Sequence, residues 1–181
     1  MRHALKMHPE SLCTAVVGIE VSAVRQTPGR LRLHYDVSGV ITKVRFPPSA
    51  KPARADELWR HTCFEMLLQA PGGAGYWEFN FSPSSQWAAY RFTDYRAGMR
   101  PCDLVAAPAI EIQTGQERFE MVVALDLAGL GLPPNAVWRA GLSVIIEGRD
   151  PHKSWWALAH PPGKPDFHQP CNFALDLPAA G

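Results

Sequence analysis

The fold is decided by three consecutive stretches, HTCFEMLLQ (61–69), YWEFNFS (76–82) and WAAYRFT (87–93). In the first two, large apolar side chains alternate with polar or small ones, which is the period of a strand with one buried face. The connections APGGAG (70–75) and PSSQ (83–86) are short and rich in turn-forming residues. Together the three stretches predict an antiparallel meander in the middle of a sheet.

Similar strand patterns lie on both sides of the meander. They cover residues 15–24, 31–37, 40–46, 109–114, 118–125, 137–147, 155–159 and 172–177. A Pro-Gly pair at 28–29 predicts a hairpin turn, and Asp56 is expected to cap a brief helical turn over 56–59. No segment with a helical period exceeds two turns. The pattern therefore predicts an all-β protein, an antiparallel β-sandwich of nine to eleven strands in a single domain over residues 1–181.

Composition excludes several classes of partner. The formal net charge of the 181 residues is +1, too small to favour duplex nucleic acid or an anionic membrane surface. No apolar run approaches the roughly 20 residues that a membrane helix needs, and residues 1–12 do not have the pattern of a secretory signal. None of the four cysteines forms a C-x-x-C pair, so we expect reduced thiols and a cytoplasmic location.

The alternation also separates two faces of the meander. Large apolar side chains share one face of each strand: Phe64, Met66, Leu68, Trp77, Phe79 and Phe81. If these fill the space between the sheets, the outer face carries His61, Glu65, Glu78 and Asn80. Cross-strand neighbours stand about 5 Å apart, so these side chains would form a cluster of acceptors for hydroxyl groups. The alternative is the ordinary polar face of a half-solvated strand.

Aromatic and ionisable side chains gather again in residues 155–168. Trp155 and Trp156 are adjacent, so on a strand they must face opposite sides, and one indole can be buried while the other is exposed. An exposed indole beside polar acceptors suits a sugar, which has an apolar face and a rim of hydroxyls. The loop that follows contains three prolines and carries four ionisable residues, His160, Lys164, Asp166 and His168. Such a loop either holds polar groups ready for a ligand or braces a crossover between the sheets.

Catalytic and metal motifs are missing from the sequence. We find no nucleophile elbow, Walker loop or zinc-protease helix. His61 and Cys63 share one strand face, but no further residues have the spacing of a zinc site. We therefore predict no metal site and no catalytic residue.

Three separated motifs resemble a known family. ELWRHTCFE (57–65), YWEFNFSP (76–83) with WAAYRF (87–92), and residues 156–167 resemble the DOMON-like domains, which are related to the family nine carbohydrate-binding modules. The subgroup most similar to this chain is named after an association with a peptidoglycan-precursor reductase. The resemblance implies a β-sandwich of jelly-roll type that binds sugars in some members and haem in others.

The resemblance also implies a site. Trp59 and Trp156 (or Trp155) would clamp the sugar, while Glu65, Glu78 and Asn80 would bind its hydroxyls. His61, Cys63 and the 160–168 loop depart from the family pattern and leave the ligand open. Haem-binding relatives use a Met and a His as axial ligands, whereas here Met66 is expected to face the core and Met99 lies in a loop without a matched partner.

The leading hypothesis is a non-enzymatic β-sandwich that binds a carbohydrate or a sugar-containing metabolite without a cofactor. The predicted ligand-binding residues are Trp59, His61, Glu65, Glu78, Asn80, Trp156, His160, Lys164, Asp166 and His168. One alternative is a haem-binding or redox module. The other is a small enzyme in which Glu65 or Glu78 works with His61 or His168 in acid-base chemistry on a sugar. The sequence does not specify an oligomeric state.

Overall fold

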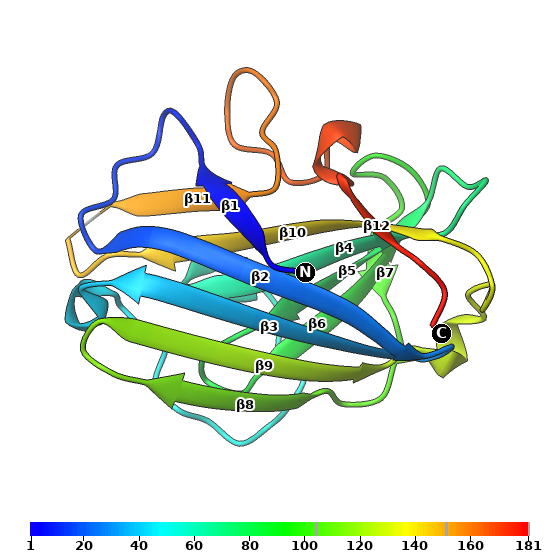
Figure 1. Ribbon diagram of the computed structural model, residues 1–181, viewed down its shortest axis with the longest axis horizontal. Helices are drawn as coiled ribbons and strands as arrows, with labels where there is room; N and C mark the ends of the chain where they lie inside the picture. Colours follow the sequence, from blue (N-terminus) through cyan, green and yellow to red (C-terminus); the bar gives the residue numbers. More distant parts are fainter. Residues whose placement is uncertain (104, 151, 181) are drawn as a thin grey trace.

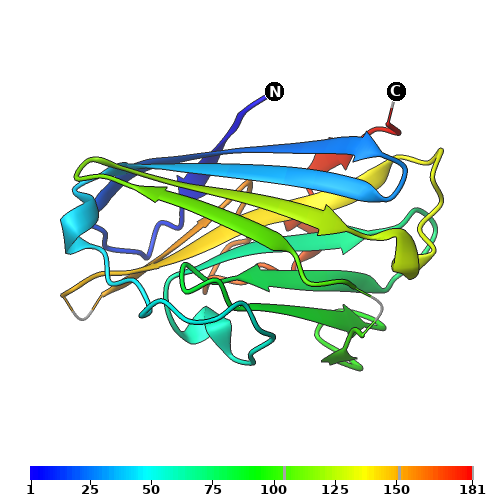
Figure 2. The same ribbon diagram turned by 90° about the horizontal axis from the view of Figure 1, so that it is seen from below.

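The structure, a computed structural model, describes residues 1–103, 105–150 and 152–180. Within these residues twelve strands pair antiparallel and form two facing layers (Figures 1 and 2). The predicted all-β antiparallel class is confirmed, with one strand more than the expected maximum of eleven. No helix in the described part of the chain has the length and apolar character needed to cross a membrane.

One layer contains the hairpin predicted around the Pro-Gly turn. Its strands, in spatial order, are β2 (Val16–Thr27), β3 (Arg30–Gly39), β9 (Arg118–Asp126) and β8 (Ala109–Thr114). The second layer contains the meander. Its strands, in spatial order, are β11 (Lys153–Ala157), β10 (Trp138–Glu147), β4 (Cys63–Gln69), β5 (Tyr76–Phe81), β6 (Trp87–Phe92) and β7 (Arg100–Pro101).

Two further strands complete the arrangement. β1 (His3–Met7) pairs with β2 on one side and β11 on the other, so it joins the two layers. β12 (Leu175–Leu177) pairs with the first three residues of β10. β1 and β7 were not predicted. Only Leu5 of β1 is buried and β7 has two residues, so neither strand shows an alternation of apolar and polar side chains in the sequence.

The main core fills the space between the layers. Tyr35 and Phe119 from one sheet pack against Phe64 from the other, with ring centroids 5.1 and 5.5 Å from that of Phe64. All three side chains are almost fully buried. The Tyr35 hydroxyl donates a hydrogen bond to the backbone carbonyl of Glu65 at 2.9 Å, so the one polar group of this cluster has a partner.

The prediction of a strand over 40–46 is wrong. A short 3₁₀ helix, η1 (Ile41–Lys43), occupies its centre, and Val44 makes only an isolated bridge to Gly148. Here the chain leaves β3, and the amides of Val40 and Ile41 bond to the carbonyls of Ala15 and Gln116, which lie in connections rather than in strands. The apolar residues of 40–46 have no neighbouring strand edge to pair with, and they therefore do not form a strand.

The helical turn before the meander is present, but its predicted cap is not. The turn is the 3₁₀ helix η2 (Leu58–Arg60), which starts after Glu57 with φ at 60° and has no side-chain cap. Asp56 instead accepts a hydrogen bond from the Tyr90 hydroxyl at 2.6 Å, which ties the turn to β6. This contact fixes the segment that carries Trp59 against the sheet.

Residues 158–174 fold over the outer face of the second layer. Phe167 and Phe173 are buried there against Leu67 and Tyr76, and they form a second, smaller core. This close packing requires a glycine on β10, because a Cβ on Gly141 would lie 2.8 Å from the Asn172 carbonyl oxygen. Another 3₁₀ turn, η4 (Pro170–Asn172), precedes β12, which is shorter than the predicted strand over 172–177.

Candidate ligand-binding site

Strand alternation places two carboxyl groups on the outer face of the meander, as predicted. Phe64, Met66 and Phe79 are in the main core between the sheets, whereas Leu67 belongs to the second, smaller core on the outer face. Register pairs Glu65 with Asn80 and Leu67 with Glu78. Glu65 and Glu78 are therefore diagonal neighbours on one face, for which Cα atoms stand about 7–8 Å apart.

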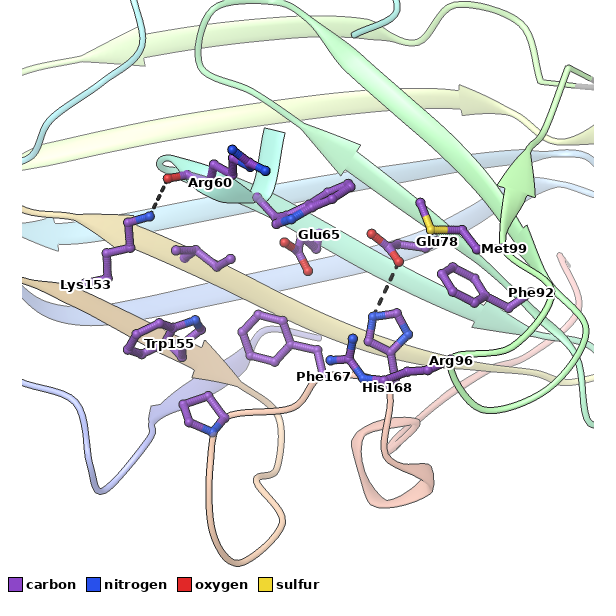
Figure 3. A pocket seen from close by; sticks show the side chains of 13 residues that line it. Arg60, Glu65, Glu78, Phe92, Arg96, Met99, Lys153, Trp155, Phe167 and His168 are labelled. Atoms are coloured by element: carbon purple, nitrogen blue, oxygen red, sulfur yellow. Dashed lines mark hydrogen bonds and ion pairs between the residues drawn. The ribbon is translucent and has the colours of Figure 1, made fainter. Parts of the chain in front are cut away.

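A pocket of about 490 Å³ opens over this face. Its lining comes from the meander, β10, β11, the η2 turn, the β6–β7 connection and the 158–174 loop: Trp59, Arg60, Glu65, Glu78, Phe92, Arg96, Met99, Ile145, Lys153, Trp155, Pro165, Phe167 and His168. Figure 3 shows the Glu65 and Glu78 carboxyl groups near the centre, with Trp155 and Lys153 toward one end and Phe92 and Met99 toward the other. Its size suits a small organic ligand.

Glu65 is unusual because it is buried and incompletely paired. The residue is 4% exposed, and its Oε1 atom has no hydrogen-bond partner among the described residues. Burial, together with the nearby Glu78 carboxyl, raises the pKa of Glu65 well above its ordinary value. Burial also raises the pKa of Glu78. Both groups are held in an environment that favours their neutral form.

A hydrogen bond and a close imidazole contact fix the direction of the Glu78 carboxyl group. Asn80 Nδ2 donates to Glu78 Oε1 at 2.6 Å, and His168 Nε2 lies 3.5 Å from Glu78 Oε2. His168 Nδ1 is 2.7 Å from the Tyr76 hydroxyl, which accepts from the Arg96 amide at 3.2 Å. Burial lowers the pKa of His168 to about 4, so its ring is neutral near neutral pH.

Aromatic side chains form the apolar walls of the pocket. Trp59 packs edge-to-face on Tyr90, with ring centroids 5.9 Å apart, and is only partly buried. Trp155 is also partly buried and pairs in register with Ile145 of β10, another wall residue. The pocket therefore combines two partly exposed indoles with two buried carboxyl groups, an arrangement able to contact both an apolar face and polar hydroxyls.

An arginine enters the pocket from the β6–β7 connection. Arg96 has φ at 49°, a left-handed conformation that is uncommon for a non-glycine residue. Its guanidinium makes two hydrogen bonds to Asp166 Oδ1, at 3.1 and 2.7 Å, and Tyr95 donates to Asp166 Oδ2 at 2.5 Å. Burial by itself would raise the pKa of Asp166, but the hydrogen bonds from Arg96 and Tyr95 outweigh this effect and lower the pKa to about 2. Asp166 thus holds the 158–174 loop and Arg96 together.

The structure brings only part of the predicted residue set to this pocket. Trp59, Glu65, Glu78 and His168 line it. Asn80 is fully buried behind Glu78 and Asp166 lies behind Arg96, so both orient lining residues without lining the pocket themselves.

Four predicted ligand residues do not line this pocket. Trp156 is 5% exposed and in the main core, where its Nε1 donates to Ser154 Oγ at 2.9 Å; the neighbouring Trp155 faces the pocket. His61 is exposed and sits 2.8 Å from Glu147 Oε2. His160 bonds to the backbone carbonyl of Lys6 at 2.7 Å and lines a separate hollow. Lys164 is an exposed loop residue.

Several lining residues were missed by sequence reasoning. Phe92 and Ile145 carry a signal that could have found them, because register with Tyr76 and Cys63 places them on the same outer face. Arg96 and Met99 lie in a connection where no alternation exists, and their inclusion depends on how residues 94–99 turn back. No group of three or more His, Cys, Asp or Glu side chains suited to a metal ion occurs among the residues described.

No protein-family model and no curated protein matches the sequence of this chain. Comparison with solved structures, in contrast, finds similar folds. A protein from Bacteroides uniformis ATCC 8492, to which a carbohydrate-binding role is ascribed, has a TM-score of 0.68 at 14% identity; the match covers 99% of this chain and 86% of that one.

Two solved complexes of a family 9 carbohydrate-binding module from Caldicellulosiruptor kristjanssonii also match. The cellotriose complex has a TM-score of 0.57 at 10% identity, over 98% of this chain and 82% of that chain. The glucose complex has a TM-score of 0.55 at 10% identity, over 98% and 85%. At these identities the likeness shows a shared β-sandwich fold, and these structural neighbours are carbohydrate-binding proteins.

Proposed function

We propose that this chain is a carbohydrate-binding β-sandwich whose ligand occupies the pocket over β4, β5 and β10. The observation that carries the proposal is the pocket itself, in which partly exposed Trp59 and Trp155 accompany the buried carboxyl groups of Glu65 and Glu78. The fold shared with the glucose and cellotriose complexes supports it at the level of architecture. The resemblance to DOMON-like domains and to their reductase-associated subgroup belongs to this proposal, as does a cytoplasmic location.

Stacking and hydrogen bonding would divide the binding energy. An aromatic ring against a ligand contributes about 0.5–1.5 kcal/mol beyond the area it buries. A neutral hydrogen bond contributes about 0.5–1.5 kcal/mol, and one to a charged group about 1.5–3 kcal/mol. Because ordering and desolvation oppose these gains, affinities in the micromolar to millimolar range are expected.

The test is calorimetric titration of the purified protein with glucose, cellotriose and a panel of other monosaccharides. Trp59→Ala should abolish binding and leave the far-ultraviolet circular dichroism spectrum unchanged. Trp77→Ala is the matched control, since Trp77 is a partly buried indole of the meander that stacks on Arg91 outside the pocket. Absence of sugar binding by the wild type, or equal loss in both variants, would refute the proposal.

A second candidate is glycoside hydrolysis, which the raised pKa of Glu65 and Glu78 favours because a general acid must be protonated near neutral pH. Here His168 beside Glu78, and not His61, would be the neighbouring imidazole. Hydrolysis of a panel of nitrophenyl glycosides tests this candidate. Activity must be lost in both Glu65→Gln and Glu78→Gln, because each carboxyl has its own role in such a mechanism.

We do not extend the proposal to haem, because the pocket residues fit it poorly. His168 already has Tyr76 Oη at one ring nitrogen and Glu78 at the other. Met66 is fully buried in the main core, which leaves Met99 as the methionine at the pocket. An absorbance scan after incubation with haemin tests this alternative, and uptake of haemin would revive it.

A further inference from the structure

We propose that the sugar bound in this pocket carries a protonated amino group, which the Glu65 and Glu78 carboxyl groups receive. The inference rests on the proposed function and adds the chemical class of the ligand. It follows from the charge balance of the lining, from an unpartnered acceptor and from the aromatic surroundings.

The charge balance leaves the centre of the pocket acidic. Both lining arginines are already paired with carboxylates that do not line the pocket: Arg96 with Asp166 and Arg60 with Glu57, each at 2.7 Å. Lys153 donates to the Arg60 carbonyl and lies toward one end, next to Trp155 (Figure 3). Arg96 lowers the pKa of both glutamates through space, but in the described part of the chain neither glutamate forms an ion pair with an arginine or lysine.

The unpartnered acceptor is Glu65 Oε1. Glu78 is supported by Asn80, but the buried Glu65 Oε1 makes no hydrogen bond of good geometry in the described part of the chain. The Ser143 hydroxyl, opposite Glu65 on β10, lowers the pKa of Glu65 but is likewise without a well-formed hydrogen bond. A buried acceptor without a donor is unfavourable, so a ligand that supplies one gains affinity. A sugar hydroxyl supplies one neutral donor, whereas an ammonium group supplies up to three donors and the opposite charge.

The aromatic walls favour the same chemistry. Trp59, Phe92, Trp155 and Phe167 all line the pocket, and the faces of such rings attract cations. Exclusion of water by these rings strengthens an ion pair between an ammonium group and the carboxyls. A neutral sugar gains stacking and neutral hydrogen bonds but no ion pair, and an N-acetylated sugar has lost the charge.

Proton release should accompany binding of the amine. The titratable and charged groups around the glutamates are Tyr35, Arg60, Cys63, Tyr76, Tyr90, Arg96, Lys153 and His168. Desolvation and the mutual repulsion of the two carboxyls favour retention of a proton in the empty pocket. An ammonium group replaces that proton, so the protein loses it to the buffer on binding.

The experiment compares sugars in matched pairs below about pH 7, where a sugar amine is protonated. Glucose, galactose and mannose are each titrated by calorimetry beside the corresponding 2-amino sugar and its N-acetyl derivative. At least one amino sugar should bind at least about tenfold more tightly than both of its neutral counterparts. Repeating that titration in two buffers of different ionisation enthalpy should show net proton release.

The variants assign the preference to the carboxyls. Glu65→Gln should reduce the ratio of amino to neutral affinity to below about threefold, and Glu111→Gln, an exposed residue on β8, should keep it. Near-equal affinities across every pair, or a ratio unchanged in Glu65→Gln, would overturn this inference and leave carbohydrate binding standing. If no sugar of any kind binds, the proposed function itself fails. Should Glu65→Gln not fold, proton release by the wild type decides the same question.

Discussion

Replacing each of the adjacent tryptophans by alanine separates the pocket from the core. Trp156 is 5% exposed, and its indole both fills the main core and donates to the buried Ser154 hydroxyl. Trp156→Ala should cost about 3–5 kcal/mol in the free energy of unfolding. With a urea m-value of about 1–3 kcal/mol/M, the unfolding midpoint should fall by at least about 1 M.

Trp155→Ala should show the opposite balance. Trp155 is only partly buried at the pocket wall, so its loss should cost less than about 2 kcal/mol of stability. Sugar binding should weaken at least about tenfold, because the stacking surface is removed. In contrast, Trp156→Ala should bind with near wild-type affinity at temperatures where it is folded.

The assay combines urea unfolding, followed by far-ultraviolet circular dichroism, with calorimetric titration of each variant at a temperature where all are folded. The titrant is the sugar that the wild type binds most tightly in the panel above. If Trp156→Ala abolished binding at wild-type stability while Trp155→Ala still bound, the assignment of the two faces of β11 would be wrong, and the pocket could not serve as proposed.

Two other predictions concern stability and loop packing. Because the pKa of Glu65 is raised on folding, the native state holds more protons than the unfolded state, and the wild type should lose stability as pH rises from about 4.5 through the raised value. Each unit of that rise corresponds to about 1.4 kcal/mol. Glu65→Gln should flatten this dependence of stability on pH. The thermal midpoint of the variant should then be higher than that of the wild type at about pH 8 but not at about pH 4. Parallel curves of thermal midpoint against pH for the two proteins would contradict the assignment. Gly141→Ala should displace the loop at Asn172, lowering stability by about 1–3 kcal/mol and weakening sugar binding, because the new Cβ would lie 2.8 Å from a carbonyl oxygen. Gly73→Ala, where nothing lies within 4 Å, is its control, and equal thermal midpoints for the two variants would count against a tight loop contact.

Alternation along the meander was sufficient to predict much of this molecule. Side chains of a strand point to opposite faces with a period of two, so the positions of Phe64, Met66 and Phe79 predicted the buried face directly. The same rule placed Glu65 and Glu78 together on the outside, where the structure has them. The class of the fold followed from the number of such segments and the turns between them.

Tertiary structure decided which of two chemically identical neighbours faces the pocket. Strand parity requires Trp155 and Trp156 to point in opposite directions, but it does not say which direction is outward. The answer comes from the register with β10. Ile145 of the second, smaller core lies opposite Trp155, and Val144 of the main core lies opposite Trp156.

The electrostatics of the site also depend on contacts between distant segments. Arg96 reaches the pocket because Asp166, seventy positions later in the chain, holds its guanidinium. Glu65 becomes a buried, unpartnered carboxyl because residues 158–174 pack Phe167 and Phe173 over the outer face that a lone sheet would leave in water. A local pattern determines which way a side chain points, since strand geometry is set by neighbours in sequence. The solvation and charge partners of that side chain are set by whichever segments pack against it, and this depends on the whole chain.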